Sequence, residues 1–352
     1  MHWFDVDKRN YMSFCCFKRE YKLALMKIIV TGCNGFIGSH LSARLLKEGH
    51  IVVGVDIAEP SAEVAALFAP YKQTKQFVDL RDDIVTTSAV RDNPDADVLC
   101  NLAALAGVRT SVENPEAYVR TNVHGFVHLL QQCVENRLLR VVYASSSSVY
   151  GASVRLPYSE SDPLADGVVS PYAQTKLINE QFAQLYARLH GMISIGLRFF
   201  TVYGPRGRKD MAPYKFLKAI DTGRPLTRFG DGEDTFRDYT YVDDIVNGIV
   251  ASIERVCSGL LSSVNRTPPA RGSSAVYNLG NGQPILLNDF IATCETATGK
   301  KAKIVTLPVP QSDVVGTHAN IEKAQTDLGY NPIVRVESGL NNTVKWMRKF
   351  DT

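Results

Sequence analysis

The sequence predicts an α/β fold: a doubly wound parallel sheet with a smaller C-terminal domain. Short apolar segments typical of buried strands alternate with helical segments as far as Phe199, and this alternation predicts a parallel sheet covered on both faces. Past Phe200 the sequence becomes loop-rich, with frequent glycine and proline. We therefore expect residues 26–200 to form the sheet domain, with 237–280 returning to it, and residues 201–352 to form mainly the second domain.

The first predicted strand, turn and helix carry three glycines. An apolar strand at 28–30 is followed by Gly32, Gly35 and Gly38 at three-residue spacing, and then by a helix that stops at Gly49. The free N–H groups and the dipole of a helix N-terminus favour an anion, and glycines let a pyrophosphate approach the backbone. A tight turn without a ligand has the same pattern, so the glycines alone are a weak signal.

The second predicted strand favours a dinucleotide. Residues 51–56 form another apolar run that ends in Asp56, about 20 residues past the glycines, where dinucleotide-binding domains bind a ribose hydroxyl. A carboxylate would repel a 2′-phosphate, and no Arg or Lys follows Asp56 closely. The sequence therefore predicts a Rossmann-type domain that binds NAD rather than NADP.

The third and fourth predicted strands supply further candidates for the cofactor site. Residues 76–80 predict the third strand, in which Asp79 is placed to meet an adenine edge. Residues 97–104 predict the fourth strand, whose small Ala103 and Ala104 would let a cofactor lie against the backbone. Plain packing explains the two alanines equally well.

The fifth strand ends in hydroxyl groups. Thr121 and Asn122 open a long helical pattern, after which residues 140–145 predict a strand that runs into four serines, Ser145 to Ser148. Ligands of such folds bind at the carboxyl edge of the sheet, so these hydroxyl groups are candidates for the site.

A long helix and a sixth strand complete the predicted sheet domain. Ser170 and Pro171 predict the helix start, with serine as the cap and proline at the first helical position. Residues 193–199 predict the sixth strand. The apolar face expected of the helix consists of Leu177, Ile178, Phe182, Leu185 and Leu189.

Charge, hydropathy and cysteine usage exclude several classes of function. The formal net charge of +3 is too small to argue for binding to nucleic acid or to a membrane, and no apolar run approaches the length of a membrane span. Seven scattered cysteines indicate reduced thiols in a cytoplasmic protein, not a metal site. Residues 1–25 lack the apolar core of a signal peptide, and we expect a peripheral extension there.

Tyr172 and Lys176 are the strongest candidates for acid–base chemistry. They lie four residues apart on the predicted helix, so they share one face, and a neighbouring lysine favours the phenolate form of a tyrosine. The same spacing occurs twice elsewhere in the chain, and a solvated helix face explains it too. The serine-rich strand end upstream distinguishes this pair.

Four motifs together resemble the extended short-chain dehydrogenase/reductase family of sugar-nucleotide epimerases and dehydratases. The resemblance extends from about Lys27 to near the C-terminus and includes the segments at 237–244 and 277–280. The motifs are Thr-Gly-x-x-Gly-x-x-Gly, Leu102-Ala-Ala, Ser145-Ser-Ser-Ser-Val-Tyr-Gly151 and Tyr172-x-x-x-Lys176.

The resemblance implies a tightly held NAD, a nucleotide-diphosphate sugar as substrate, and specific contacts. It implies catalysis by Ser146, Tyr172 and Lys176. The implied substrate contacts are Arg109, Ser148, Thr201, Arg208, Arg237 and Asp313, with Arg237 as a diphosphate clamp. Besides Tyr172 and Lys176, the cofactor contacts we expect are Gly32, Asn34, Gly35, Phe36, Ile37, Gly38, Asp56, Asp79, Leu80, Leu102, Ala103, Ala104 and Asn122.

The serine-rich strand end separates the members of this family. Its dehydratases carry Thr-Asp-Glu there, whereas this chain has serines from Ser146 to Ser148 and lacks both acids. Its UDP-glucuronate decarboxylases carry a glutamate where Ser148 stands. The resemblance therefore implies an epimerase.

The segment from Arg198 to Ala212 points to the sugar. It is similar to the corresponding stretch of UDP-glucuronate 4-epimerases, whereas UDP-galactose 4-epimerases usually have asparagine where Thr201 stands. The guanidinium fork of Arg208 suits the carboxylate of a glucuronate, and the hydroxyl groups of Thr201 and Ser148 can donate to the same group. Alternatively, Arg206 and Arg208 are surface charges or bind only the diphosphate.

Three positions depart from the family pattern. Leu105 replaces a glutamine of the cofactor wall, Ser312 replaces a glycine, and Pro310 replaces an arginine that contacts phosphate in many relatives. The resemblance thus implies a 4-epimerase of a UDP-sugar, with UDP-glucuronate as the expected sugar. It also implies a homodimer formed through two long helices, here at about 116–136 and 171–190. The alternatives are a UDP-glucose 4-epimerase, a UDP-glucuronate decarboxylase and a non-catalytic NAD-binding protein.

Overall fold

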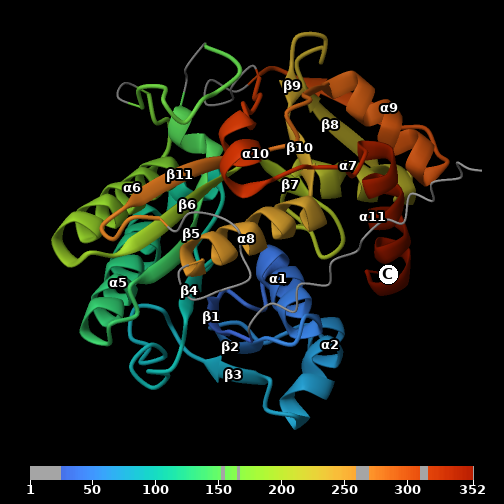
Figure 1. Ribbon diagram of the computed structural model, residues 1–352. Coiled ribbons are helices and arrows are strands. Elements are labelled where there is room, and N and C mark those ends of the chain that lie inside the picture. Colours follow the sequence, from blue (N-terminus) through green and yellow to red (C-terminus); the bar gives the residue numbers. More distant parts are fainter. Residues whose placement is uncertain (1–24, 152–154, 165–166, 259–268, 310–315, 352) are drawn as a thin grey trace, which may run out of the picture.

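A seven-stranded parallel sheet forms the centre of the computed structural model, which describes residues 25–151, 155–164, 167–258, 269–309 and 316–351. The strand order is β11-β6-β5-β4-β1-β2-β3 (Figure 1), and every neighbouring pair is parallel. The strands are β1 (Lys27–Thr31), β2 (Ile51–Asp56), β3 (Phe77–Arg81), β4 (Val98–Asn101), β5 (Arg140–Ser146), β6 (Ile193–Phe199) and β11 (Ser274–Leu279). The predicted doubly wound sheet is confirmed.

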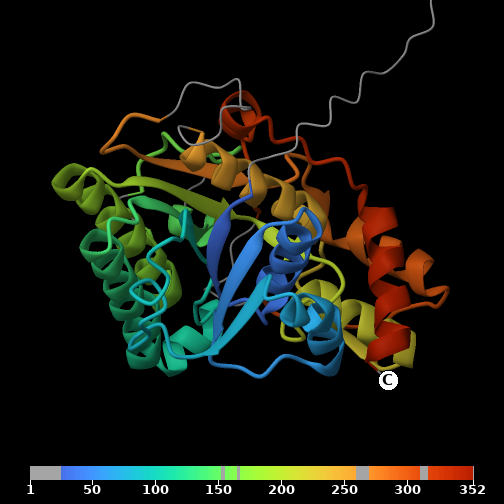
Figure 2. The same ribbon diagram turned by 60° about the horizontal axis from the view of Figure 1, so that its bottom comes forward.

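Helices cover both faces of this sheet (Figure 2). Side chains of β1 alternate between two cores: Ile28 and Val30 pack with α1 and α8, whereas Ile29 packs with α5 and α6. Burial on both faces explains why the parallel strands read as continuous apolar runs. The covering helices are α1 (Phe36–Lys47), α2 (Ala62–Gln73) and α8 (Val242–Cys257) on one face, and α5 (Phe126–Glu135) and α6 (Pro171–His190) on the other.

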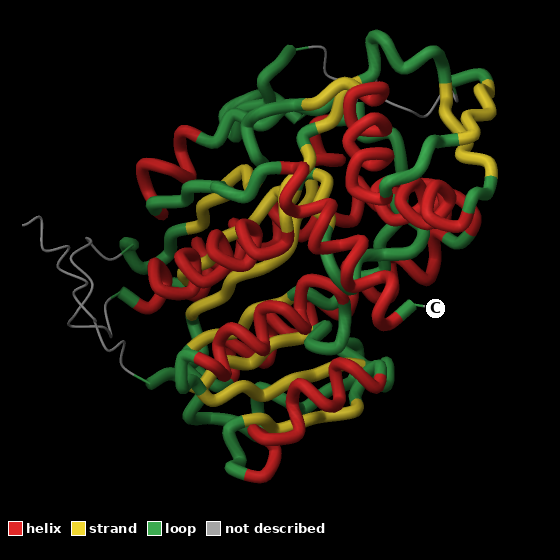
Figure 3. The backbone as a smooth tube through the Cα atoms, turned by 90° about the vertical axis from the view of Figure 1, so that its right-hand side faces the viewer, coloured by secondary structure: helices red, strands yellow, loops and turns green. Residues whose placement is uncertain are grey.

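The remaining elements lie beside the carboxyl edge of the sheet or connect its strands (Figure 3). Three two-stranded sheets pair β7 with β10, β9 with β12 and β8 with β13. The strands are β7 (Thr201–Tyr203), β8 (Pro225–Phe229), β9 (Phe236–Arg237), β10 (Tyr239–Tyr241), β12 (Ile285–Leu286) and β13 (Lys303–Leu307). The helices are α3 (Val108–Glu113), α4 (Pro115–Tyr118), η1 (Val119–Gly125), η2 (Ser147–Tyr150), α7 (Ala212–Thr222), α9 (Leu287–Thr298), α10 (Glu322–Leu328) and α11 (Val336–Phe350).

The segment after Phe200 contributes to both parts of the molecule. Helix α8 packs on the large sheet, and β11 pairs with β6 at its edge, so residues 242–257 and 274–279 belong to the sheet in space. The exact domain boundaries stay a prediction. Of the predicted N-terminal extension, only Leu25 lies among the described residues.

The apolar face predicted for α6 is wrong in part. Leu185 and Leu189 are 36% and 65% exposed. The most deeply buried face consists of small and polar residues: Ala173, Thr175, Lys176, Asn179, Ala183, Tyr186 and Ala187. Apolar periodicity missed it because small side chains let the helix approach its neighbours closely, and because the buried polar groups serve the site.

Candidate functional site

A cavity of about 650 Å³ opens at the carboxyl edge of the large sheet. It lies where β1, β2, β4, β5 and β6 end, and the turn between β7 and α7 borders it. Most of the predicted site residues line it: Gly32, Gly35, Phe36, Ile37, Gly38, Asp56, Leu102, Ala103, Ala104, Ser146, Ser148, Tyr172, Lys176, Thr201 and Arg208. The topology thus brings together residues that lie between Gly32 and Arg208 in the chain.

The glycine turn between β1 and α1 allows close packing. Gly32 has φ +71°, and a Cβ there would lie 2.9 Å from the amide nitrogen of Ala103. A Cβ on Gly38 would lie 2.0 Å from the carbonyl oxygen of Gly32, so only glycine lets α1 begin this close to the strand. Gly35, at the cap of α1, meets only the carbonyl oxygen of Gly32 and lines the cavity. This turn fits the pyrophosphate of a dinucleotide.

Asp56 is held at the end of β2 by two backbone groups. Its carboxylate accepts hydrogen bonds from the N–H of Asn34 (2.9 Å) and of Ala58 (2.9 Å). Carboxylate oxygens have further lone pairs, so Asp56 can still accept from a ribose hydroxyl. Asn34 does not line the cavity itself; its side chain donates to the carbonyl oxygen of Ala58, as does Arg81 from the neighbouring strand.

Two predicted cofactor contacts, Asp79 at the adenine edge and its neighbour Leu80, lie outside the cavity wall. The carboxylate of Asp79 accepts hydrogen bonds from Lys72 and Arg81, and neither Asp79 nor Leu80 lines the cavity. The cavity is lined instead by residues that follow the end of β3, namely Asp82, Asp83 and Ile84. Sequence reasoning missed them because they follow the strand end in a turn without a distinctive motif.

Asn122 supports the cavity wall from behind. Its side chain accepts a hydrogen bond from the N–H of Leu105 (2.8 Å) and donates to the carbonyl oxygen of Leu105 (2.9 Å) and the hydroxyl of Thr175 (3.0 Å). The side chain of Leu105, one of the departures from the family pattern, lines the cavity and is 38% exposed.

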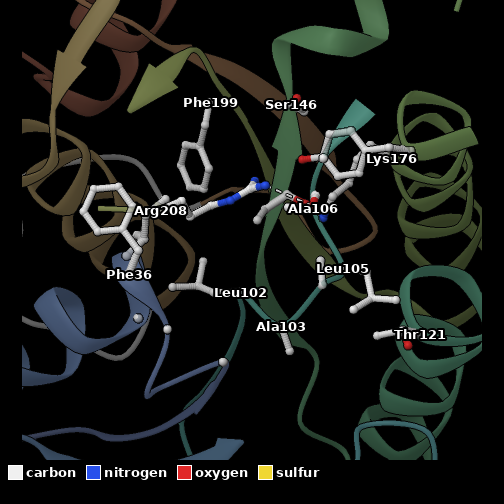
Figure 4. Close-up of a pocket in the computed structure, with 18 of the residues that line it drawn as sticks. Phe36, Leu102, Ala103, Leu105, Ala106, Thr121, Ser146, Lys176, Phe199 and Arg208 are labelled. Carbon is white, nitrogen blue, oxygen red and sulfur yellow. Dashed lines mark hydrogen bonds between the residues drawn. The ribbon is translucent and has the colours of Figure 1, made fainter. Parts of the chain in front are cut away.

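Ser146 and Lys176 lie on one side of the cavity (Figure 4). Tyr172 lines the cavity beside them, with a side-chain hydrogen bond to Ser146. Ser146 is the last residue of β5, and its hydroxyl oxygen accepts a hydrogen bond from the N–H of Ser148 (3.2 Å). The N-cap hydroxyl of Ser170, which accepts from the N–H of Ala173, begins the helix that carries Tyr172 and Lys176.

The environment sets the protonation of Tyr172 and Lys176. Burial raises the pKa of Tyr172, while a hydrogen bond with Ser146 and the positive charge of Arg208 lower it. Burial lowers the pKa of Lys176 to about 8. The Lys176 ammonium donates to the carbonyl oxygen of Ala144 (2.8 Å) and lies 6.0 Å from the centre of the Tyr172 ring. The sequence assigned the lowering of the Tyr172 pKa to Lys176, and that role stays a prediction; Ser146 and Arg208 are the groups that lower this pKa here.

Arg208 reaches across the cavity toward the catalytic side (Figure 4). Its Nε and Nη2 donate to the carboxylate of Asp210 (3.0 and 2.5 Å), and Nη2 also donates to the carbonyl oxygen of Ala106 (3.1 Å). That carbonyl also accepts from the hydroxyl of Tyr118. Sequence reasoning missed Asp210. This carboxylate bonds to Nε and Nη2 of Arg208, so Nη1 is the guanidinium nitrogen that Asp210 does not contact.

Two other predicted substrate residues, Arg109 and Arg237, do not line the cavity. The guanidinium of Arg109 stacks 5.0 Å from the centre of the Phe229 ring, and Arg237 donates to the carbonyl oxygen of Phe236 (2.9 Å). Asp313, Pro310 and Ser312 lie outside the described residues. The roles of these residues toward substrate therefore stay predictions.

The described part of the chain shows neither a metal site nor a membrane-spanning helix. No cluster of His, Cys, Asp and Glu there could hold a metal ion, and none of its helices is long and apolar enough to cross a membrane. The five described cysteines are all buried and free: Cys33, Cys100, Cys133, Cys257 and Cys294.

Known proteins resemble this chain in sequence and in fold. The model of the NAD dependent epimerase/dehydratase family matches residues 28–264. A probable UDP-glucuronate 4-epimerase of Rhizobium meliloti is 37% identical over 335 residues, which cover 91% of this chain and 96% of the relative. UDP-glucuronate 4-epimerase 4 of Arabidopsis thaliana is 38% identical over 91% of this chain and 74% of the relative.

A solved structure agrees with these relatives. The UDP-glucuronic acid 4-epimerase of Bacillus cereus, in complex with UDP-glucuronic acid and NAD, superimposes with a TM-score of 0.81. The two sequences are 35% identical, and the superposition covers 92% of this chain and 99% of the other.

Proposed function

Because the chain belongs to the NAD dependent epimerase/dehydratase family, we propose that it catalyses the NAD-dependent 4-epimerisation of a UDP-sugar, with UDP-glucuronate as the substrate and UDP-galacturonate as the product. One observation carries the choice of sugar: Arg208 points into the cavity that holds Ser146, Tyr172 and Lys176. The named relatives and the Bacillus cereus structure with UDP-glucuronic acid support the same substrate.

The proposed reaction is an oxidation at C4 of the sugar followed by a reduction from the opposite face. An NAD held by the glycine turn and Asp56 would supply the acceptor, and then the donor, of the C4 hydride. Tyr172, as phenolate, takes the proton of the sugar 4-hydroxyl and later gives it back. Ser146 donates a hydrogen bond to the same oxygen, which stabilises the keto form between the two half-reactions. Lys176, held by the carbonyl of Ala144, supplies a positive charge beside them.

The carboxylate of the sugar requires a further control. A 4-keto uronate is a β-keto acid, which loses CO₂ when its carboxylate stands perpendicular to the carbonyl plane. Arg208, Thr201 and Ser148 all line the cavity, and together they can hold the carboxylate away from that geometry. Retention of CO₂ is therefore part of the proposed function.

One observation favours UDP-glucose as a second candidate substrate. Asp210 pairs with Arg208 through two hydrogen bonds. A neutral sugar could leave this ion pair in place, whereas a uronate must share or displace it. The relative turnover of the two sugars therefore tests the role of Arg208.

We also propose that the protein is a cytoplasmic homodimer. Helix α6 packs beside α5 and exposes Leu185 and Leu189, and an apolar helix face of this kind can be buried against a second copy. The free, buried cysteines agree with a reducing compartment. Size-exclusion chromatography with light scattering measures the mass in solution directly.

The purified protein should be given UDP-glucuronate and UDP-glucose separately, with the products identified by NMR. We expect UDP-galacturonate from UDP-glucuronate and much slower conversion of UDP-glucose.

Arg208→Ala should lower turnover of UDP-glucuronate more than that of UDP-glucose, or release a UDP-pentose. Tyr172→Phe should retain NAD and lose roughly 100-fold or more of the turnover. An equal effect of Arg208→Ala on both sugars would exclude the carboxylate role.

A further inference from the structure

Arg206, two residues before Arg208, ties the turn between β7 and α7 to the cofactor-binding half of the molecule. Its Nη1 donates to the carboxylate of Glu63 on α2 (3.0 Å), and its Nε donates to the hydroxyl of Ser39 on α1 (3.1 Å). The other carboxylate oxygen of Glu63 accepts from the indole N–H of Trp346 on α11 (2.8 Å). One side chain of the turn thus joins three helices.

This joint is shielded from solvent and lies apart from the cavity. The side chains of Arg206 and Glu63 are 16% and 19% exposed, so their ion pair is better protected than an ordinary surface pair. Neither residue lines the cavity, whereas Arg208 does. Arg206 therefore does not serve as the carboxylate ligand, because its guanidinium is engaged by Glu63 and Ser39 outside the cavity lining.

The backbone of the turn needs such a support. Arg206 has φ +61°, in the left-handed region that side chains other than glycine rarely adopt. A ring nitrogen of His40, also on α1, makes a 2.9 Å hydrogen bond with the carbonyl oxygen of Pro205. Two neighbouring contacts, one from the backbone and one from the side chain, hold the turn against the helix whose N-terminus carries the glycine turn.

We propose that Arg206 and Glu63 are positioning residues that fix the Arg208 guanidinium relative to the cofactor site and thereby set the preference for an acidic sugar. Few contacts separate Glu63 from Arg208. The carboxylate of Glu63 binds the Arg206 side chain, which stabilises the left-handed backbone conformation of Arg206. Arg208 follows two residues later in the same turn. This inference rests on the proposed function for the identity of the ligand, but the link between Glu63 and the turn does not.

The test uses Glu63→Gln, which removes the charge that holds Arg206 and keeps an oxygen for Trp346. The matched control is Glu48→Gln, which removes the partner of Arg44 at the other end of α1. Both are made in the NAD-loaded Tyr172→Phe protein, which binds ligand without turnover. Calorimetry measures the Kd for UDP-glucuronate and UDP-glucose, and hydrogen exchange measures the amides of Gly207 and Met211, which donate within the turn.

We expect Glu63→Gln to weaken UDP-glucuronate binding about tenfold, as for loss of a charge-assisted hydrogen bond, and UDP-glucose binding less than about twofold. The two turn amides should exchange faster, and Glu48→Gln should change neither measurement. Equal weakening of both ligands, or unchanged amide exchange, would overturn the inference. If the parent protein shows no preference between the sugars, the proposed substrate is wrong, and the exchange rates alone then decide whether Glu63 fixes the turn.

Discussion

At Tyr172 two opposing effects decide how much of the phenolate base is present. Burial raises the pKa of the phenol, and Ser146 and Arg208 lower it. Arg208 thus acts on both ends of the proposed reaction, because the same guanidinium faces the sugar carboxylate and favours the ionised base. A substitution of Arg208 should therefore change a pH profile as well as an affinity.

The first prediction concerns that pH profile. In the Arg208→Gln protein the pKa of Tyr172 should rise, because a positive charge that favours the phenolate has been removed. The rising limb of kcat/KM, which reports groups of the free enzyme, should move to higher pH. Arg91→Gln is the control, since the side chain of Arg91 is 69% exposed, pairs with Asp92 and does not line the cavity. An unchanged limb in Arg208→Gln would show that Arg208 does not act on the base.

The second prediction concerns Lys176, whose folded-state pKa of about 8 lies below the ordinary 10.5. At pH 7 the lysine is charged in both the folded and the unfolded protein. The whole free-energy cost of burying the charged group therefore lowers the stability of the folded state. Between the two pKa values the unfolded chain binds more protons, and this destabilisation disappears as the pH rises. Lys176→Met should therefore raise the free energy of unfolding by about 2 kcal/mol at pH 7, after loss of the bond to Ala144, and by less at pH 10.

Urea denaturation of the NAD-free protein at the two pH values measures this difference. Lys301→Met is the control, because the side chain of Lys301 is 89% exposed and its substitution should change stability little. A loss of stability in Lys176→Met at pH 7 would contradict the prediction. The gain should be accompanied by loss of turnover, as expected where an active-site residue is retained for chemistry at the expense of stability.

Several residues of the site could be predicted from sequence because a motif reports them. A helical spacing marks Tyr172 and Lys176, a strand end marks the serines, and the family resemblance selects Ser146 among them. All three line one cavity. Asp210 could not be found in this way, since an acid two residues after an arginine in a loop is common. Its role depends on the conformation of the turn, in which it meets Arg208 through two hydrogen bonds.

At the scale of elements, a buried ion pair fastens α6 to the end of the sheet. Glu180 on α6 accepts from Nε (2.9 Å) and Nη2 (2.7 Å) of Arg198 on β6, and also from the hydroxyl of Ser145 on β5 (2.5 Å). The side chains of Arg198 and Glu180 are only 3% and 9% exposed. This network joins the strand that ends in Ser146 to the helix that carries Tyr172.

The third prediction follows from this network. Glu180→Gln leaves the Arg198 charge buried without its anion, so the free energy of unfolding should fall by about 3 kcal/mol. The control is Glu295→Gln, because the partner of Glu295, Lys301, is almost fully exposed and the pair should contribute less than about 1 kcal/mol. Thermal or urea denaturation measures both. If Glu180→Gln lowers the free energy of unfolding as little as the control does, another group must compensate the buried charge of Arg198.

Helix α6 also shows where sequence periodicity fails for an element. Its start at Ser170 and Pro171 was predictable from cap chemistry, and the hydroxyl of Ser170 does accept from the N–H of Ala173. Its buried face was not, because apolar side chains mark a face only where burial is driven by hydrophobicity. Here Lys176 and Asn179 are buried while Leu189 is exposed.

At the scale of the whole molecule, the cavity lies between the sheet edge and the turn at 204–211, so both parts of the chain must be in place for catalysis. The strand order places β1, β4, β5 and β6 side by side, and their carboxyl ends converge on one edge. The sheet was predictable because parallel strands leave strong apolar signals. The approach of the turn was not, since it depends on side-chain contacts between residues more than 140 positions apart.

The central claim is that this one cavity oxidises and reduces the same carbon of a UDP-uronate without net redox change. The most direct test gives the enzyme UDP-glucuronate labelled with deuterium at C4, in ordinary water, and follows the product by NMR. We predict UDP-galacturonate that retains deuterium at C4. Replacement of the deuterium by solvent hydrogen, or a UDP-pentose as the main product, would contradict the claim.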